Sequence, residues 1–511
     1  MTQVRLSLFV PVIAVTLSSC TVGPDYNVVS APVPEKFKEL KGKLLKGWKL
    51  AAPRESVDTS AWWAVYRDPT LDALERQVEI SNQTVAAAAA AYEQARTLIR
   101  QAQAQLFPTV TASYGVTRNY TGAALANSSS GGSTTSGTTS ASTSSSSSST
   151  HGIVTTTYTT QGDLTWELDV WGKIRRQIES NTAGAQVSAA DLANAKLTAQ
   201  AQLATAYFNM RAAYSLKDLL DKTAAQYKVT LEITQHQYKA GSVSEADLVA
   251  AETQLMATQA ASISTGVAAA QMEHAVAALI GKPPAELNLS HSLLKGGIPA
   301  SPIGVPSELL ERRPDVAAAE RMMQQENALI GVAVAAYYPD ITLTASLGYT
   351  GGIPLPINPA HEFWALGGTA LETVFEGGLR SAQVDSAKAT YWQSVANYRQ
   401  TVLAAFQQVE DQLAAIRVQS DQLKVQERTV AEARKAVTVY TNQYRAGLVA
   451  FTSVVVAEAT LLADEQAALA TRQNLFVASV ALIEALGGGW DKSKLPTPAE
   501  VSTGISILPQ L

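Results

Sequence analysis

The chain has 511 residues, of which 46% are hydrophobic and 16% charged, and its formal net charge at pH 7 is -5. This balance, without a long run of like charge, gives no electrostatic footprint for DNA or RNA, so we expect no nucleic-acid partner. The single cysteine excludes an internal disulfide and a cysteine-ligated zinc site. No segment of the mature chain has the apolar length of a membrane-spanning helix, so a bilayer crossing would have to use strands.

The first twenty residues are typical of a bacterial lipoprotein signal. Arg5 precedes an apolar stretch from Leu6 to Leu17, which has the charged start and apolar middle of a secretory signal, here residues 1–19. The sequence Leu17-Ser18-Ser19-Cys20 resembles a lipobox, in which Cys20 receives a diacylglycerol and, after cleavage, an N-acyl chain. The alternative is a cysteine that lies in a signal peptide by chance. Thr21, in place of an inner-membrane retention Asp, predicts delivery to the outer membrane.

Next come a helical stretch and two stretches with the alternation of a half-buried strand. The helical pattern covers about 71–106, and apolar and small polar residues alternate over 109–117 and 157–170. Between the strands, residues 121–155 are mostly Ser, Thr and Gly and bury too little apolar area to fold. We expect a mobile external loop there, and we favour a passive solvated linker without a receptor.

Helical periodicity then becomes unusually long. Helices are predicted over 173–240 and 245–280, and a second set has strands at 341–349 and 363–375 and a helix over 378–444. In that last helix apolar residues recur at a strict spacing of seven: Val395, Val402, Val409, Ile416, Leu423, Val430, Val437 and Tyr444. A repeat of seven supercoils left-handedly, and at about 1.5 Å per residue each long helix would reach about 100 Å. A plain coiled-coil rod stays open as an alternative.

The chain also repeats itself. Gln237-Tyr238-Lys239-Ala240-Gly241 has an echo in Gln443-Tyr444-Arg445-Ala446-Gly447, and other paired segments keep the same order. One unit of helix, strand, loop, strand, long helix, turn and helix therefore occurs twice. Four strands cannot close a barrel, and an open edge in lipid would leave backbone groups unpaired. Three copies would supply twelve strands, so we expect a homotrimer, although a soluble sandwich would show the same alternation.

Several separated motifs resemble the outer-membrane factor family, which includes TolC and the OprM-type lipoproteins. They are Cys20-Thr21-Val22-Gly23-Pro24-Asp25-Tyr26, the segment from Trp62-Trp63 to Leu74, and Glu311-Arg312-Arg313-Pro314-Asp315-Val316. The resemblance implies a mainly α, internally duplicated TolC-like fold. Each chain would contribute to a long α-helical barrel and add four strands to a 12-stranded trimeric transmembrane β-barrel. It also implies a periplasmic adaptor protein and an inner-membrane pump, often of the resistance-nodulation-division class, as partners.

The resemblance also suggests a division of the mature chain. A lipidated segment wrapping the equatorial region would cover 20–68, and the first repeat would cover 69–282. An equatorial linker over 283–313 would join it to the second repeat at 314–489, and a tail at 490–511 would follow.

The turns after the two long helices are the expected periplasmic tip, because glycine suits the left-handed conformation of a helix C-terminal cap. They resemble the family's adaptor-docking hairpins, with tip residues Gly241, Ser242, Val243, Gly447, Leu448 and Val449. By the same resemblance, Asp247 and Tyr444 match a hydrogen-bonded latch, while a helix-cap carboxylate and a seam aromatic stay open as alternatives. Ser453 and Val456 stand where some members carry aspartates, which predicts a more apolar gate.

Acidic residues of the strand regions are candidates for a negative lumen lining, and a solvated face is the alternative. They are Asp163, Glu167, Asp169 and Glu372. The five histidines show no metal-ligand spacing, and we find no phosphate loop or nucleophile elbow, so neither an enzyme nor a cofactor is expected. The predicted function is a passive efflux duct of the outer membrane. A trimeric adhesin or structural coiled coil is the alternative, although such proteins usually place one barrel at a chain terminus.

Overall fold

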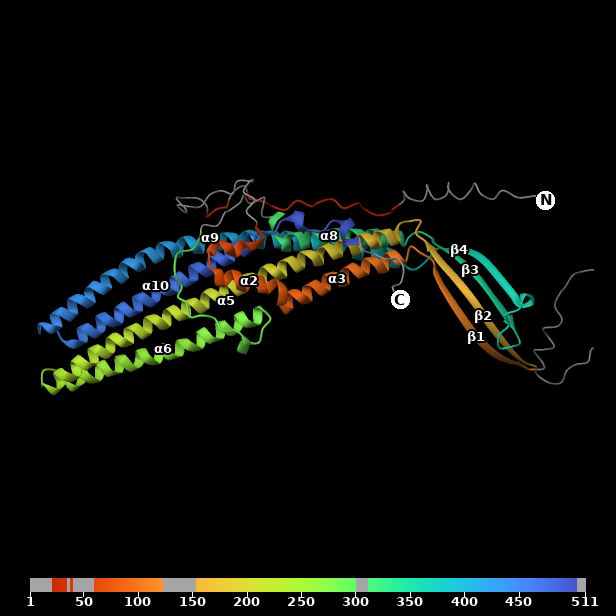
Figure 1. Ribbon diagram of the computed structural model, residues 1–511. Helices are drawn as coiled ribbons and strands as arrows, with labels where there is room; N and C mark the ends of the chain where they lie inside the picture. Colours follow the sequence, from red (N-terminus) through yellow and green to blue (C-terminus); the bar gives the residue numbers. More distant parts are fainter. Residues whose placement is uncertain (1–20, 35–36, 40–58, 123–152, 300–310, 503–511) are drawn as a thin grey trace, which may run out of the picture. The chain divides into compact units, whose positions relative to one another are not determined.

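The computed structural model describes residues 21–34, 37–39, 59–122, 153–299 and 311–502 (Figure 1). The predicted signal peptide, the predicted lipidation residue Cys20 and the middle of the predicted external loop lie outside these ranges. The described residues belong to two compact units. One contains the four strands with the adjoining helix ends, and the other contains most of the helical residues.

Helices dominate the chain. The α-helices are α2 (Pro69–Ser81), α3 (Gln83–Ala104), α5 (Lys173–Lys239), α6 (Glu245–Leu279), α8 (Pro314–Ala335), α9 (Leu379–Arg445), α10 (Phe451–Ala485) and α11 (Pro498–Ser502). Short 3-10 helices are η1 (Thr59–Tyr66), η2 (Pro284–Glu286), η3 (Pro359–His361) and η4 (Lys492–Lys494). In the described part of the chain, no helix is long and apolar enough to span a membrane.

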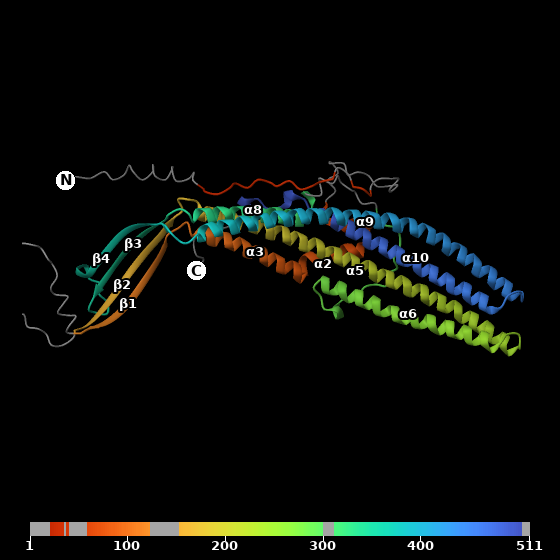
Figure 2. The same ribbon diagram turned by 180° about the vertical axis from the view of Figure 1, so that it is seen from behind.

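The internal duplication is visible in the helix lengths. Helices α5 and α9 have 67 residues each, and α6 and α10 have 35 residues each. In both ribbon views α5 runs beside α6 and α9 runs beside α10, so each repeat ends in a helical hairpin (Figures 1 and 2).

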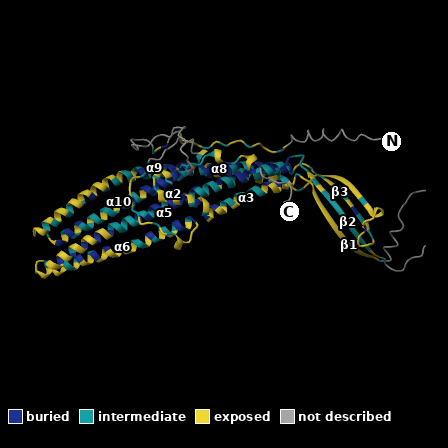
Figure 3. Cartoon of the chain, viewed as in Figure 1, coloured by how far each residue is buried: buried dark blue, intermediate teal, exposed yellow. Residues whose placement is uncertain are grey.

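The predicted seven-residue repeat forms the buried face of α9. Val395, Val402, Val409 and Ile416 are at most 2% exposed and pack in one cluster with residues of α10 such as Leu482. Helix α9 also shows exposed residues on its other faces (Figure 3). The repeat therefore fixes which side of the long helix packs within its own chain.

The single helix predicted over 71–106 is wrong, because the structure divides it at Asn82. Asn82 has extended backbone angles, and its Oδ1 accepts hydrogen bonds from Thr84 N and Val85 N at 2.9 and 3.0 Å. Its Nδ2 donates to Leu279 O at 2.7 Å. An asparagine that caps a new helix competes with continuation of the old one, and apolar periodicity does not register this.

The strands form one antiparallel sheet in the order β1-β2-β3-β4. Their bounds are β1 Thr109–Thr121, β2 Ile153–Leu168, β3 Asp340–Gly351 and β4 Glu362–Leu371. In that order β1 and β4 are the edge strands, and within the described ranges each pairs on one side only.

Three predicted strand boundaries need correction. The predicted loop 121–155 begins and ends inside strands, because Thr121 pairs with Ile153 and Asn119 pairs with Thr155. The β-branched residues at the start of β2 continue the ladder beyond the serine-rich composition that defined the loop. The last strand was predicted to run to Phe375, but β4 ends at Leu371, before the glycine pair that precedes α9.

Candidate functional site

Both helical hairpins reverse at a glycine with the same geometry. Gly241 has φ +73° and Gly447 has φ +74°, the left-handed region that was expected. Ser242 N donates to Gln237 O, and Leu448 N donates to Gln443 O, both at 2.9 Å. This hydrogen-bond pattern closes the last turn of each long helix and satisfies its free carbonyl groups. The two repeats therefore end in matching tips.

The helices that leave the two turns begin differently. Ser244 and Asp247 form a capping box at the start of α6, with Asp247 Oδ2 accepting from Ser244 Oγ at 2.8 Å and from Ser244 N at 3.2 Å. Ala450 precedes α10 and makes no side-chain cap. Because a capping box satisfies two free backbone donors, the first turn is fixed more firmly than the second.

The predicted docking residues lie at both turns with different exposure. Ser242 is exposed and Val243 half-buried, while Leu448 is 75% exposed and Val449 is half-buried. The first tip thus presents a hydroxyl group and the second presents a large apolar side chain. Their role in binding an adaptor stays a prediction.

The two predicted latch residues do not bond to one another within the chain. Tyr444 Oη donates to Gln237 Oε1 at 2.5 Å and so ties α9 to α5. Burial, and then the negative charge of Asp247, raises the pKa of Tyr444. Asp247 itself acts as a helix cap, which was the alternative considered for it. A latch role for either residue stays a prediction.

One face of α10 carries no charge in the first five turns after the tip. Its exposed residues in this stretch are Thr452, Val456, Thr460, Ala463, Ala467 and Ala470. Val456 is 64% exposed, and Ser453 is half-buried beside this face. The spacing of three and four residues puts these side chains on one side of the helix. A gate role for Ser453 and Val456 stays a prediction.

Sequence reasoning missed an acidic residue two positions beyond Val456. Glu458 is half-buried, and burial raises its pKa to about 7. Its repeat counterpart Glu252 is exposed. Glu458 also contributes to the raised pKa of Tyr227 on α5, although desolvation is the larger cause. The duplicated Ala-Glu pattern was visible in the sequence, but the difference in burial between its two copies was not.

The sheet has one apolar and one polar face, as the alternation predicted. The register aligns Val110, Leu164, Ala345 and Leu366 across the four strands in one row. The neighbouring row consists of Thr111, Asp163, Ser346 and Ala365. Val110 and Leu366 are 70% and 76% exposed, so the apolar face is not covered by the described part of the chain. Such a surface is suited to lipid.

The predicted acidic residues differ in their partners. Asp163 lies on the polar face and accepts from Gln161 Nε2 at 2.8 Å. Glu167 is 3.4 Å from Lys173 Nζ, and Asp169 Oδ2 is 3.1 Å from Arg175 Nε.

Glu372 also forms an ion pair, with its Oε1 2.6 Å from Arg380 Nη1. Further carboxylates join these pairs, since Asp340 lies 3.5 Å from Lys173 and Glu376 lies 3.1 Å from Arg380. Lys173, Arg175 and Arg380 offset part of the negative charge of these carboxylates. The sequence analysis had not included these three cations. A negative lumen lining stays a prediction.

Two of these carboxylates lie just before the long helices α5 and α9 and accept hydrogen bonds from their first backbone N–H groups. Asp169 accepts from Ile174 N and Arg175 N at 3.0 Å, and Glu376 accepts from Arg380 N at 3.0 Å. Carboxylates at a helix N-terminus satisfy free backbone donors and oppose the helix dipole. Asp169 and Glu376 therefore have a structural role beside any electrostatic one. Among the described residues, no group of three or more His, Cys, Asp or Glu side chains could hold a metal ion.

The geometry of duplicated hairpins and a two-faced sheet agrees with what is known of related chains. The family model described as "Outer membrane efflux protein" matches residues 74–282 and 305–488. The chain belongs to this family. It is similar to the toluene efflux pump outer membrane protein TtgC of Pseudomonas putida, with 28% identity over 501 residues that cover 96% of each chain.

Other relatives extend the comparison. The cation efflux system protein CusC of Escherichia coli is 25% identical over 485 residues, which cover 94% of this chain and 98% of that one. The structure of the outer-membrane channel OprN has a TM-score of 0.80 and 29% identity, covering 92% of this chain and all of that one. The CmeC outer membrane channel of Campylobacter jejuni, at 21% identity, shows the fold alone with a TM-score of 0.82, covering 96% and 99%.

The family and fold settle the broad function. The chain has the TolC-like fold and is an outer-membrane efflux channel protein of a tripartite pump, located in the outer membrane of a Gram-negative bacterium. The family consists of transport proteins and not of enzymes. These findings support the predicted efflux duct and not the adhesin-like alternative.

Proposed function

We propose that three copies of the chain form one closed duct, the exit component of a pump that exports small molecules. Cys20 anchors each copy by its acyl chains, and the protein needs no cofactor. An adaptor protein docks at the tip turns, and an inner-membrane pump, of the resistance-nodulation-division class, supplies the energy. Opening follows when adaptor contacts favour a wider arrangement of the tip helices, because a ligand shifts an equilibrium toward the state that it binds better.

The observation that carries this proposal is the pair of open sheet edges. Strands β1 and β4, of 13 and 10 residues, each pair on one side only among the residues that the structure describes. Unpaired backbone groups inside a lipid bilayer cost several kcal/mol each, and only closure of the sheet removes them. Pairing β4 of one copy with β1 of the next, three times, gives twelve strands, an even number in the range of outer-membrane barrels.

Exposed apolar seams on the helices support the same assembly. On α6, Val249, Met256 and Ile263 recur at a spacing of seven and are 54%, 56% and 76% exposed. On α9, Val418 and Val425 are likewise seven residues apart, at 53% and 62% exposed. A heptad seam without a partner in its own chain is the surface by which helices of neighbouring chains pack.

The relatives support the choice of partners. TtgC and CusC are named as components of efflux systems for toluene and for cations. A duct that lacks catalytic chemistry depends on other proteins for energy and for the selection of its cargo.

We test the assembly with a seam variant that places two carboxylates on α6. Met256→Glu combined with Ile263→Glu should abolish the trimer, because three apolar seams would each bury charge without a partner. The control, Ala268→Glu, adds a carboxylate at an exposed α6 position about 120° around the helix from Met256, outside the seam, and should leave the trimer intact. Light scattering of the full chain in detergent measures the mass. A trimer that survives the double substitution contradicts the proposed packing.

A measurement of ion conductance distinguishes an open duct from a solid rod. Purified protein in a planar bilayer should show discrete openings, and the adaptor should raise the open fraction. A trimer without any conductance, even with the adaptor present, would overturn the proposed export route.

A further inference from the structure

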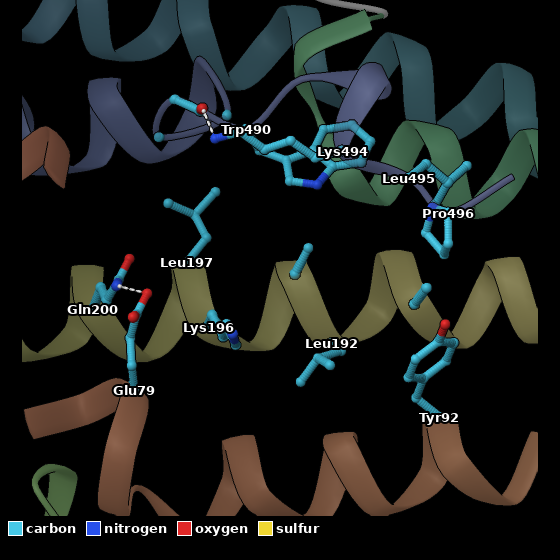
Figure 4. A pocket seen from close by; sticks show the side chains of 15 residues that line it. Glu79, Tyr92, Leu192, Lys196, Leu197, Gln200, Trp490, Lys494, Leu495 and Pro496 are labelled. Carbon is cyan, nitrogen blue, oxygen red and sulfur yellow. Dashed lines mark hydrogen bonds between the residues drawn. The ribbon is translucent and has the colours of Figure 1, made fainter. Parts of the chain in front are cut away.

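A groove of about 360 Å³ lies along α5, between α3 and the segment that follows α10 (Figure 4). We call it the Lys196 groove, and its lining includes Glu79, Tyr92, Lys196, Gln200 and Trp490. Figure 4 shows Trp490 on the segment after α10, Tyr92 on α3 and Lys196 on α5 between them. The volume lies within the range of about 300–1,000 Å³ that small-molecule sites occupy. None of these residues belongs to the strands or to the tip.

The wall formed by the segment after α10 is preformed. Gly487, Gly488 and Gly489 all have positive φ, at +92°, +56° and +87°. A Cβ at Gly487 would lie 1.8 Å from Arg312 O, and one at Gly488 would lie 2.1 Å from Leu197 Cδ1. Only glycine allows this combination of backbone angles and close approach. The triglycine turn therefore brings the backbone close to Arg312 and Leu197 directly before Trp490.

Three hydrogen-bond donors of the lining are unused. Among the described residues, no acceptor and no ion-pair partner is found for Lys196 Nζ, and no acceptor for the Trp490 indole N–H or the Tyr92 hydroxyl. All three residues are half-buried. None of the three donor atoms is among the buried side-chain atoms without a partner, so they face the solvent of the groove and are open to an acceptor. The groove thus offers donors, one of them cationic, to a visiting molecule.

The rest of the lining is divided between apolar and already-bonded groups. Leu192, Leu197 and Leu495 give the groove an aliphatic surface beside its two aromatic rings. Lys494 Nζ donates to Gly489 O at 2.9 Å. Glu79, the one carboxylate of the lining, accepts from Gln200 Nε2 at 3.4 Å.

We propose that the Lys196 groove binds an amphipathic organic anion, with its acidic group on Lys196 and its apolar body between Trp490 and Tyr92. A carboxylate, sulfonate or phosphate group has the acceptor oxygens that the unused donors need. An aromatic or aliphatic body matches the leucines and the two rings. Glu79 repels the anion and so limits its affinity. The lining shares no residue with the strands or the tip turns.

The test uses the full chain in nanodiscs of zwitterionic lipid, titrated calorimetrically with naphthalenesulfonate and with neutral naphthalenemethanol. Lys196→Met should weaken binding of the sulfonate by about tenfold or more, because it removes a charge-assisted contact. Glu79→Gln should tighten it several-fold, because it removes the repulsion. Neither substitution should change the affinity of the neutral analogue. The matched control, Lys435→Met, changes an exposed lysine of α9 outside the groove and should have no effect.

The proposal is supported if sulfonate binding is weaker in Lys196→Met and tighter in Glu79→Gln, while the affinity of the neutral analogue stays the same in both. Equal affinity for the sulfonate and the neutral analogue, or an unchanged affinity in Lys196→Met, overturns it. A second measurement identifies the source of the anion, with phosphatidylglycerol added to the nanodiscs. Lys196-dependent retention of this lipid in native mass spectrometry, with displacement of the sulfonate, assigns the site to a lipid headgroup. Sulfonate binding that the lipid does not affect assigns it to a free organic anion.

Discussion

Glu75 is an acidic side chain buried in the helical core. It is 0% exposed and lies on the buried face of α2 with Leu71, Leu74 and Val78. Neither carboxyl oxygen has a hydrogen-bond partner among the described residues. Desolvation, and then the charges of Asp72 and Glu79, raises its pKa from 4.5 to about 9. The side chain is therefore protonated in the folded chain at neutral pH.

This burial predicts a falling stability on the alkaline side. Between about pH 4.5 and pH 9 the folded state keeps a proton that the unfolded state has lost, so the free energy of unfolding decreases by about 1.4 kcal/mol per pH unit. Glu75→Gln replaces the titratable carboxyl group with a neutral amide of the same shape. It should therefore flatten the dependence of the free energy of unfolding on pH. Thermal unfolding followed by circular dichroism across the window measures the effect.

The exposed Glu252 supplies the matched control for that experiment. Glu252→Gln should leave the pH dependence of the wild-type chain unchanged. If Glu75→Gln behaves like this control, the acid is not protonated in the folded state.

The break between α2 and α3 shows how one residue defines two elements. Asn82 caps α3 through its oxygen and holds the end of α6 through its nitrogen. The neighbouring Ser81 strengthens the same junction, because its hydroxyl donates to Ile280 O at 2.6 Å. Three helices therefore meet at one pair of polar side chains.

Asn82→Ala should destabilise this junction by about 1–2 kcal/mol, since it removes a helix cap and a hydrogen bond between helices. Asn82→Asp keeps the capping oxygen and loses only the donor to Leu279, so it should cost less. Denaturant unfolding of the full chain measures both, with Gln94→Ala at an exposed position of α3 away from the junction as the control. Equal losses for Ala and Asp would show that the cap contributes nothing.

These elements also show what the sequence can and cannot predict. The spacing of Val395, Val402 and Val409 predicted the buried face of α9 correctly, because a repeat of seven leaves one geometry for the seam. The glycines of both tips were also predicted correctly, because few other residues adopt a positive φ. Asn82 was missed because its capping bonds depend on local side-chain chemistry and on the distant Leu279. The cations beside Glu167 and Glu372 were missed because pairing is a property of three-dimensional position.

At the scale of the whole molecule, the uncharged face of α10 bears on what the duct selects. Thr452, Val456 and Thr460 provide no carboxylate on the exposed side of the helix next to the second tip. A constriction of such residues has no fixed charge to attract cations, and it opposes ions chiefly by the cost of dehydrating them. Within the proposed trimer, each of these positions occurs three times.

Val456→Asp should therefore make the channel cation-selective, by placing three carboxylates at the predicted gate. The measurement is the reversal potential of the purified channel in a salt gradient, which should move toward the value for a cation-permeable pore. Ala470→Asp adds the same charge on the same face of α10, farther from the tip, and should shift the potential much less. Equal shifts would place the constriction away from the second tip.

The equal helix lengths of the two repeats restrict how such a chain can change in evolution. Each hairpin consists of a helix of 67 residues and one of 35 residues. An insertion in the helices of one repeat alone would make its hairpin longer than the other, so the two tip turns would no longer match. An insertion far from a whole number of helical turns would also rotate the seam of α9 away from its partners, whereas about seven, eleven or eighteen residues would keep its direction. A longer relative that bridges a wider periplasm should therefore have gained such lengths, in both arms of both hairpins together.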